Sequence, residues 1–203
     1  MTIKIYHARR ARSARVIWLL EELGVPYELE TLEFKPEALN SPEYLQVHPL
    51  GQLPAIRDGE ITLFESGAIV QYLLEKYGAG RLEPALGTPE RALYLQWFHF
   101  GEASLASHVS EIVRQRFGQP PGPHTDAILA LARTRLRAAL RVVERALDGR
   151  DFICGATFTA ADIMVVYGIV MARITRELPD EFPRVAAYFD RLKQRPAYAT
   201  AWA

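Results

Sequence analysis

The chain has 203 residues, of which 49% are hydrophobic and 24% are charged. Lysine and arginine together number 24, as do aspartate and glutamate, so the formal net charge is zero. This balance argues against a general binder of nucleic acid or of anionic membranes. The length is sufficient for one large domain or two small ones with a sizeable core.

The sequence offers no sign of a membrane span, a disulfide framework or a metal site. No apolar run approaches the roughly 20 residues that a membrane helix needs, and the N-terminus lacks an apolar stretch of signal-peptide length. The single cysteine, Cys154, excludes an internal disulfide and any paired-cysteine motif, and its setting favours core packing over a nucleophile. We therefore expect a cytoplasmic protein that holds no metal.

The first part of the sequence has the pattern of a βαβ unit. Residues 2–6 alternate as a strand does, residues 14–23 place apolar side chains on one helical face, and residues 25–34 predict a second strand. Two strands joined through a helix within about 30 residues are expected to be parallel.

A hairpin and a helix follow. Residues 53–57 and 60–64 predict two strands, joined by a tight turn in which both Asp58 and Gly59 have positive φ. Ser66 is expected to cap the next helix, which ends at Gly78.

The remainder predicts a linker and then helices alone. Residues 79–87 contain three glycine or proline breakers without periodicity, which is typical of a linker. Beyond them we expect a long amphipathic helix over residues 125–147 and a last helix over about 183–193. Residues 159–162, "TAAD", resemble a capping box that opens a buried apolar helix. The predicted fold is α/β plus all-α.

Pro54 is unexpected at the start of a strand, because proline has no N–H to give to a sheet. One interpretation is an edge strand that begins with an ordinary trans bond. The other is a cis bond between Leu53 and Pro54, which would turn the backbone of Leu53 toward a ligand. Such an open edge can pair with a short peptide.

Glu65 and Ser66 follow at the mouth of the next helix. The unpaired N–H groups there, with the Ser66 hydroxyl, could hold a carboxylate, and Glu65 could hold an ammonium. A ligand with an α-amino and an α-carboxyl group at one end, and a peptide bond near Leu53, would satisfy both features. The simpler alternatives are a helix cap for Ser66 and an exposed first-turn acid for Glu65.

Three stretches make the protein resemble a cytosolic glutathione S-transferase: "ARVIWLLEELGVPYELE", "PLGQLPAIRDGEITLFESGAIVQYLLEKYG" and "FTAADI". A fourth, "YLQWFHFGEASL", is similar to bacterial and fungal members, which suggests a serine-type enzyme. The resemblance implies a thioredoxin-like domain (βαβ-ββα) over residues 1–78, a linker over 79–87 and an all-helical domain over 88–203. It also implies a homodimer that joins glutathione to a small hydrophobic electrophile, bound between the domains, in detoxification.

The resemblance also assigns contacts to the cysteinyl and γ-glutamyl parts of glutathione. Leu53 would pair its backbone with the cysteinyl part, with Pro54 in cis. Glu65 and Ser66 would bind the γ-glutamyl end, and Gln52 would reach the ligand with its side chain.

Three further contacts are implied by the same resemblance. Asn40 falls where some classes carry the lysine that meets the glycine carboxylate, and nearby Lys35 is the substitute. Glu102 would reach the glutamyl ammonium in the neighbouring subunit. Its alternative is a surface or interface ion pair.

The group that ionises the thiol departs from the family pattern. A free thiol has a pKa of about 8.5, so the family supplies a hydroxyl or thiol beside it. The matching position here falls on Arg10 or Ala11, which supply neither. We rank Ser13 first as the group that contacts the sulfur, Arg10 or Arg12 second as electrostatic support, and Tyr6 third.

Each of these candidates has a structural alternative. Ser13 could cap the helix that follows, and Tyr6 could pack beneath that helix. The four arginines of this segment could form a solvated basic rim; they are Arg9, Arg10, Arg12 and Arg15. The alternative functions are a glutathione-dependent isomerase, or a glutathione-binding protein with little catalysis.

Overall fold

A computed structural model of the protein describes residues 2–118 and 120–203 and divides into two compact units. One contains the sequence up to Leu82 together with Lys193–Ala203, and the other is Glu83–Leu192. The limit after Leu82 lies within the stretch expected as a linker. The last residues join the unit that contains the sheet, whereas the sequence pattern assigned them to the helical half.

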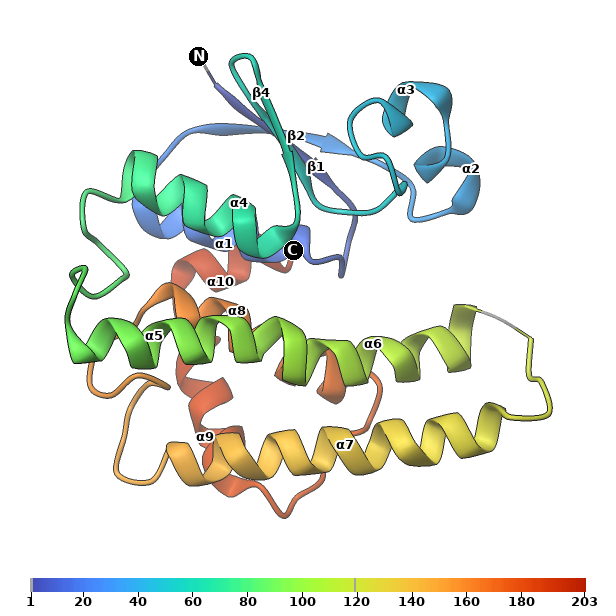
Figure 1. Cartoon of the computed structure of the whole chain (residues 1–203), viewed down its shortest axis with the longest axis vertical. Coiled ribbons are helices and arrows are strands. Elements are labelled where there is room, and N and C mark those ends of the chain that lie inside the picture. Colours follow the sequence, from blue (N-terminus) through green and yellow to red (C-terminus); the bar gives the residue numbers. More distant parts are fainter. Residues whose placement is uncertain (1, 119) are drawn as a thin grey trace. The chain divides into compact units, whose positions relative to one another are not determined.

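The first unit is built on a four-stranded sheet in the order β2-β1-β3-β4 (Figure 1). β1 (Ile3–His7) runs parallel to β2 (Tyr27–Thr31), and α1 (Ser13–Leu23) connects them. β3 (Ala55–Asp58) runs antiparallel both to β1 and to β4 (Ile61–Phe64). The predicted βαβ unit and hairpin are therefore confirmed.

The turn of the hairpin lies one residue later than predicted. Asp58 pairs with Ile61, so Gly59 and Glu60 form the loop, and Gly59 takes the positive φ of 61°. Asp58 stays in its strand because its buried carboxylate accepts hydrogen bonds from the helical segment behind it. The donors are Tyr72, Lys76 and Tyr77, at 2.7–2.8 Å.

Two helices lie side by side over one face of the sheet, α1 and α4 (Ser66–Leu73) (Figure 1). Both turn their apolar residues inward, and α1 ends at Gly24 with φ 66°, as its sequence predicts. Glu65 is the residue that precedes the first turn of α4, so the helix begins at the residue that was expected to cap it. A π-helical segment, η1 (Leu74–Gly78), continues α4.

Three short helices of this unit were not predicted: α2 (Pro36–Leu39), α3 (Pro42–Leu45) and α10 (Pro196–Ala201). Each has a proline in its first turn, where the missing N–H costs nothing. With four to six residues each, they are too short to show a helical period in the sequence.

The C-terminal helix α10 packs on α1, which explains why it belongs to the first unit. The rings of Trp18 and Tyr198 meet edge to face with centroids 5.1 Å apart. Arg195 forms two hydrogen bonds of 2.6 and 2.7 Å with the carboxylate of Glu22.

The second unit is helical, as predicted. Its elements are α5 (Pro89–Phe100), η2 (Gly101–Ala106), α6 (Ser107–Val113), η3 (Arg114–Gly118), α7 (Thr125–Ala146), α8 (Ala160–Ile174) and α9 (Pro183–Leu192). The first four form one helical run, in which η2 and η3 are π-helical, and α7 packs against α6 (Figure 1).

α8 is the central helix of this unit and is buried along most of its length, as its apolar sequence predicts. The capping box is confirmed, because Thr159 and Asp162 exchange hydrogen bonds between their side chains and backbone N–H groups. Across the described residues, no helix, α8 included, has both the length and the apolar character needed to cross a bilayer.

Candidate functional site

The strand register brings Pro54 and the Glu65-Ser66 pair to one end of the sheet. Ala55 is the common partner of Tyr6 on β1 and of Phe64 on β4. Pro54 and Glu65 are each one residue beyond this row, so they lie beside each other where β3 begins and β4 ends. The end of β1 lies at the same place.

The bond between Leu53 and Pro54 is cis, so the trans alternative is wrong. The ladder of β3 begins at Ala55, which leaves the backbone of Leu53 outside it. The Leu53 side chain is buried in a cluster with Ala8 and Ala11 from the loop after β1. Ala11, one of the two positions that the resemblance matches to a hydroxyl or thiol, therefore packs in the same cluster as Leu53.

Tyr44, which no sequence pattern had indicated, holds the segment that leads to Leu53. Its hydroxyl donates a hydrogen bond of 2.6 Å to the backbone carbonyl oxygen of Gln52, whose side chain is exposed. Burial raises the pKa of Tyr44, so this donor keeps its proton at neutral pH. The ring of Tyr44 packs 5.5 Å from that of Tyr6, and this contact favours packing as the role of Tyr6.

The helix mouth at Glu65 and Ser66 has an unusual backbone and a buried charge behind it. Glu65 has φ 72°, which is rare for a residue other than glycine and frequent at ligand sites. The Ser66 hydroxyl does not cap α4; it accepts a hydrogen bond of 3.0 Å from Nη1 of Arg15. Arg15 and Ser66 are only 1% and 3% exposed.

The burial of Arg15 corrects the interpretation of the arginines as a common solvated rim. Arg9 and Arg10 are exposed and Arg12 is half-buried, whereas Arg15 lies inside the unit. Arg15 precedes Leu19 by one helical turn on the buried face of α1, and this spacing was the signal that could have revealed it. Arg10 has φ 66°, so the loop before α1 is also strained.

Ser13, the first candidate for contact with the sulfur, lies against a histidine. Its Oγ is 2.8 Å from Nδ1 of His7, and the residue is 0% exposed. Ser13 is the first residue of α1 and its hydroxyl does not cap the helix, so that alternative is wrong. Burial lowers the pKa of the half-buried His7, which favours the neutral imidazole at pH 7, and a neutral ring nitrogen can accept a hydrogen bond from the Ser13 hydroxyl. No sequence pattern had singled out His7.

The remaining candidates lie farther along the sequence. Asn40 and Lys35 flank α2 and are exposed; Nδ2 of Asn40 donates to the carbonyl oxygen of Pro36 at 2.8 Å, and Nζ of Lys35 pairs with Glu33 at 2.8 Å. Glu102 lies in η2 of the second unit and is half-buried.

Cys154 and the histidines offer no alternative centre. Burial raises the pKa of the Cys154 thiol to about 11, so it is protonated at neutral pH, as expected of a packing residue. Within residues 2–118 and 120–203, no three or more histidine, cysteine, aspartate or glutamate side chains are grouped so as to hold a metal ion.

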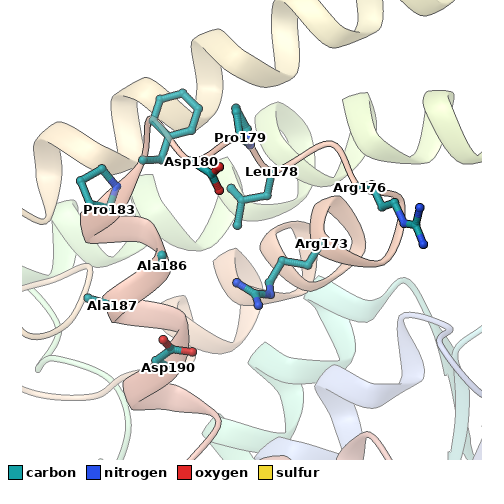
Figure 2. A pocket seen from close by; sticks show the side chains of 10 residues that line it. Arg173, Arg176, Leu178, Pro179, Asp180, Pro183, Ala186, Ala187 and Asp190 are labelled. Carbon is teal, nitrogen blue, oxygen red and sulfur yellow. The ribbon is translucent and has the colours of Figure 1, made fainter.

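The second unit carries a hollow of about 710 Å³ between the end of α8 and the start of α9 (Figure 2). Two arginines and two aspartates, Arg173, Arg176, Asp180 and Asp190, are among the residues that line it, and all four are exposed. None of the predicted site residues contributes to this hollow, so it is distinct from the site at the sheet end.

Comparison with known proteins assigns both the N-terminal and the C-terminal part of the sequence to one family. Models described as the N-terminal and C-terminal domains of glutathione S-transferase match residues 1–75 and 126–191. Glutathione S-transferase 3 of Schizosaccharomyces pombe is 29% identical over 212 residues, which cover 96% of this protein and 84% of the relative. The probable glutathione S-transferase GSTF1 of Oryza sativa subsp. japonica is 30% identical over 197 residues, which cover 94% and 90%.

Similarity in structure is equally extensive. The crystal structure of the glutathione transferase URE2P6 from Phanerochaete chrysosporium, in complex with oxidized glutathione, matches with a TM-score of 0.86 and 29% identity. The match covers 99% of this protein and 94% of that one.

Proposed function

Because the protein is a glutathione transferase of the glutathione S-transferase family, we propose that glutathione binds where Leu53, Pro54, Glu65 and Ser66 meet and is ionised there for attack on a small hydrophobic electrophile. The observation that carries this proposal is the shared end of β3 and β4, where the backbone of Leu53, which precedes the β3 ladder, and the N-terminus of α4 lie side by side.

Each end of that site suits one part of the ligand. The cysteinyl backbone pairs with the N–H and C=O of Leu53, in the manner of an added strand. The γ-glutamyl carboxylate accepts hydrogen bonds from the Ser66 hydroxyl and N–H, and the ammonium of the same group pairs with Glu65.

Four outer contacts complete the proposal. The side chain of Gln52 is exposed beside the strand edge, and Asn40 or Lys35 meets the glycine carboxylate. Glu102 reaches the glutamyl ammonium of a partner subunit in a homodimer. We place this enzyme in the cytoplasm and in detoxification; light scattering of the purified protein tests the dimer.

Substitution of Ser66 by alanine is expected to weaken glutathione binding by roughly 10- to 150-fold, because a hydrogen bond to a charged group contributes roughly 1.5–3 kcal/mol. Isothermal titration calorimetry with S-methylglutathione measures this loss without interference from the thiol. Ser107→Ala, which removes an exposed hydroxyl in α6, is the matched control. Equal affinity in the Ser66 and Ser107 variants would place the γ-glutamyl group elsewhere.

The thiol is ionised at the start of α1. Lowering the pKa of a thiol by two units takes roughly 2.7 kcal/mol, and one hydrogen bond to the thiolate supplies roughly 1.5–3 kcal/mol. Ser13, coupled to His7, supplies the hydroxyl, and Arg10 and Arg12 add positive charge. Tyr6 is the third choice, since its ring packs on a second tyrosine.

We expect Ser13→Ala and His7→Gln each to raise the pKa of the bound glutathione thiol by about one unit or more. The ultraviolet absorbance of the thiolate, followed against pH in the glutathione complex, gives this value directly. Arg10→Ala and Tyr6→Phe rank the other two groups in the same assay. If Ser13→Ala leaves both pKa and turnover unchanged, the sulfur contact is not Ser13.

A binding protein with little catalysis is the second candidate function. The observation in its favour is that Arg10 and Ala11 stand where the family carries its hydroxyl or thiol, while the Ser13 hydroxyl is buried. Glutathione affinity without turnover of aryl halides, isothiocyanates or peroxides would select it. Turnover of a maleyl acid without net consumption of glutathione would select an isomerase.

A further inference from the structure

Arg15 is a charged side chain inside the first unit, next to the residue that is proposed to receive the ligand's carboxylate. It is 1% exposed, and arginine is almost never fully buried unless it is paired. Its Nη1 donates to Oγ of Ser66 at 3.0 Å, across 51 residues of sequence and between α1 and α4. The guanidinium thus lies directly behind the mouth of α4.

This hydrogen bond determines what the Ser66 hydroxyl can do. A hydroxyl carries one donor proton and two acceptor lone pairs. Because Oγ of Ser66 accepts from Arg15, its own proton is left to donate in another direction. The positive charge behind the oxygen makes that proton a stronger donor, and the partial positive charge at the start of α4 acts in the same sense.

At the N-terminus of α4 the positive charge is therefore buried and the negative charge is exposed. A buried cation, Arg15, lies behind Ser66, and an exposed carboxylate, Glu65, lies one residue before it. An α-amino-acid group matches these charges in one orientation only, with its carboxylate toward Ser66 and its ammonium toward Glu65.

From this arrangement we infer that Arg15 is a positioning residue that acts through Ser66 to select ligands with a free α-carboxylate at the γ-glutamyl end. The inference rests on the proposed binding of glutathione at Ser66. It adds that the affinity for the γ-glutamyl carboxylate depends on the charge of Arg15 as well as on the Ser66 hydroxyl.

The test compares two ligands on four proteins by calorimetry. The ligands are S-methylglutathione and the same compound with 4-aminobutyrate in place of the glutamyl group, which keeps the ammonium but lacks the α-carboxylate. The proteins are wild type, Arg15→Met, Arg15→Lys and Arg81→Met. Arg81 is the control, because it is an exposed arginine of the same unit whose guanidinium donates to the backbone carbonyl oxygens of Leu23 and Gly78.

We expect wild type to prefer S-methylglutathione over the analogue by roughly 10- to 100-fold. Arg15→Met reduces this preference by weakening S-methylglutathione alone, Arg15→Lys keeps more of it than Arg15→Met does, and Arg81→Met keeps all of it. A Ser66→Ala background removes the effect of Arg15→Met, because the two residues act as one unit.

Other outcomes separate the inference from the proposal on which it rests. If Arg15→Met weakens both ligands equally, Arg15 is only structural and the inference is wrong, while glutathione binding stands. If wild type binds neither ligand, the proposed function fails and the inference fails with it. Should Arg15→Met not fold, Arg15→Gln takes its place, because glutamine keeps N–H donors but lacks the charge, and full preference in that variant overturns the inference.

Discussion

Replacement of Asp162 by alanine is expected to lower the free energy of unfolding by about 3–5 kcal/mol. The carboxylate is 0% exposed and accepts hydrogen bonds from both sides. Oδ1 receives the N–H of Ile153 at 2.9 Å and the hydroxyl of Tyr188 at 2.7 Å. Oδ2 receives the N–H of Thr159 at 2.8 Å and its hydroxyl at 3.2 Å.

The size of this effect follows from what the substitution leaves behind. Alanine would leave the buried donors of Ile153, Thr159 and Tyr188 without an acceptor, and each unsatisfied group costs roughly 1–3 kcal/mol. Urea denaturation followed by circular dichroism measures the change. Asp162→Asn, which retains one acceptor oxygen and the same shape, is the control and is expected to cost about 1–3 kcal/mol. A loss below about 1 kcal/mol in Asp162→Ala would contradict the assigned network.

The second large effect is expected at Gly101, where η2 crosses α8. A Cβ on this residue would lie 2.6 Å from the carbonyl carbon of Met164 and 2.8 Å from the amide nitrogen of Val165. Backbone atoms of a buried helix cannot move aside as a side chain can. We therefore expect Gly101→Ala to cost about 3 kcal/mol, at the upper end of the usual range for overpacking.

A matched glycine in the same helical run provides the control. A Cβ on Gly118 would have Arg114 Cγ as its nearest neighbour, at an ordinary 3.7 Å. Gly118→Ala is expected to be neutral or to stabilise by about 0.5–1 kcal/mol, since alanine favours the helix. If the urea midpoints of the two variants coincide, η2 and α8 are not in the close contact described here.

Much of the fold could be predicted because its signals are local. The spacing from the first strand through residues 14–23 to the second strand indicated parallel pairing, and "TAAD" indicated the start of α8. The helices α2, α3 and α10 were missed because they are shorter than the window in which a period can be recognised. The predicted position of the hairpin turn was wrong by one residue, because side chains far along the sequence hold Asp58 in the strand.

The candidate site shows a similar division. Pro54 and Glu65-Ser66 are conspicuous in the sequence because each breaks a local rule, and the register then places them together. The spacing of Arg15 from Leu19 could have indicated its burial but not its partner, and His7 breaks no local rule. Their contacts with Ser66 and Ser13 exist only once α1 has packed on the sheet, so composition and periodicity alone could not reveal those pairings.

A crystal structure of the protein with glutathione tests the central claim most directly. We predict that the cysteinyl backbone pairs with the N–H and C=O of Leu53, and that the γ-glutamyl carboxylate lies on Ser66 with its ammonium toward Glu65. Glutathione bound at another surface, or a site at Leu53 that stays empty at saturating ligand, would contradict the account.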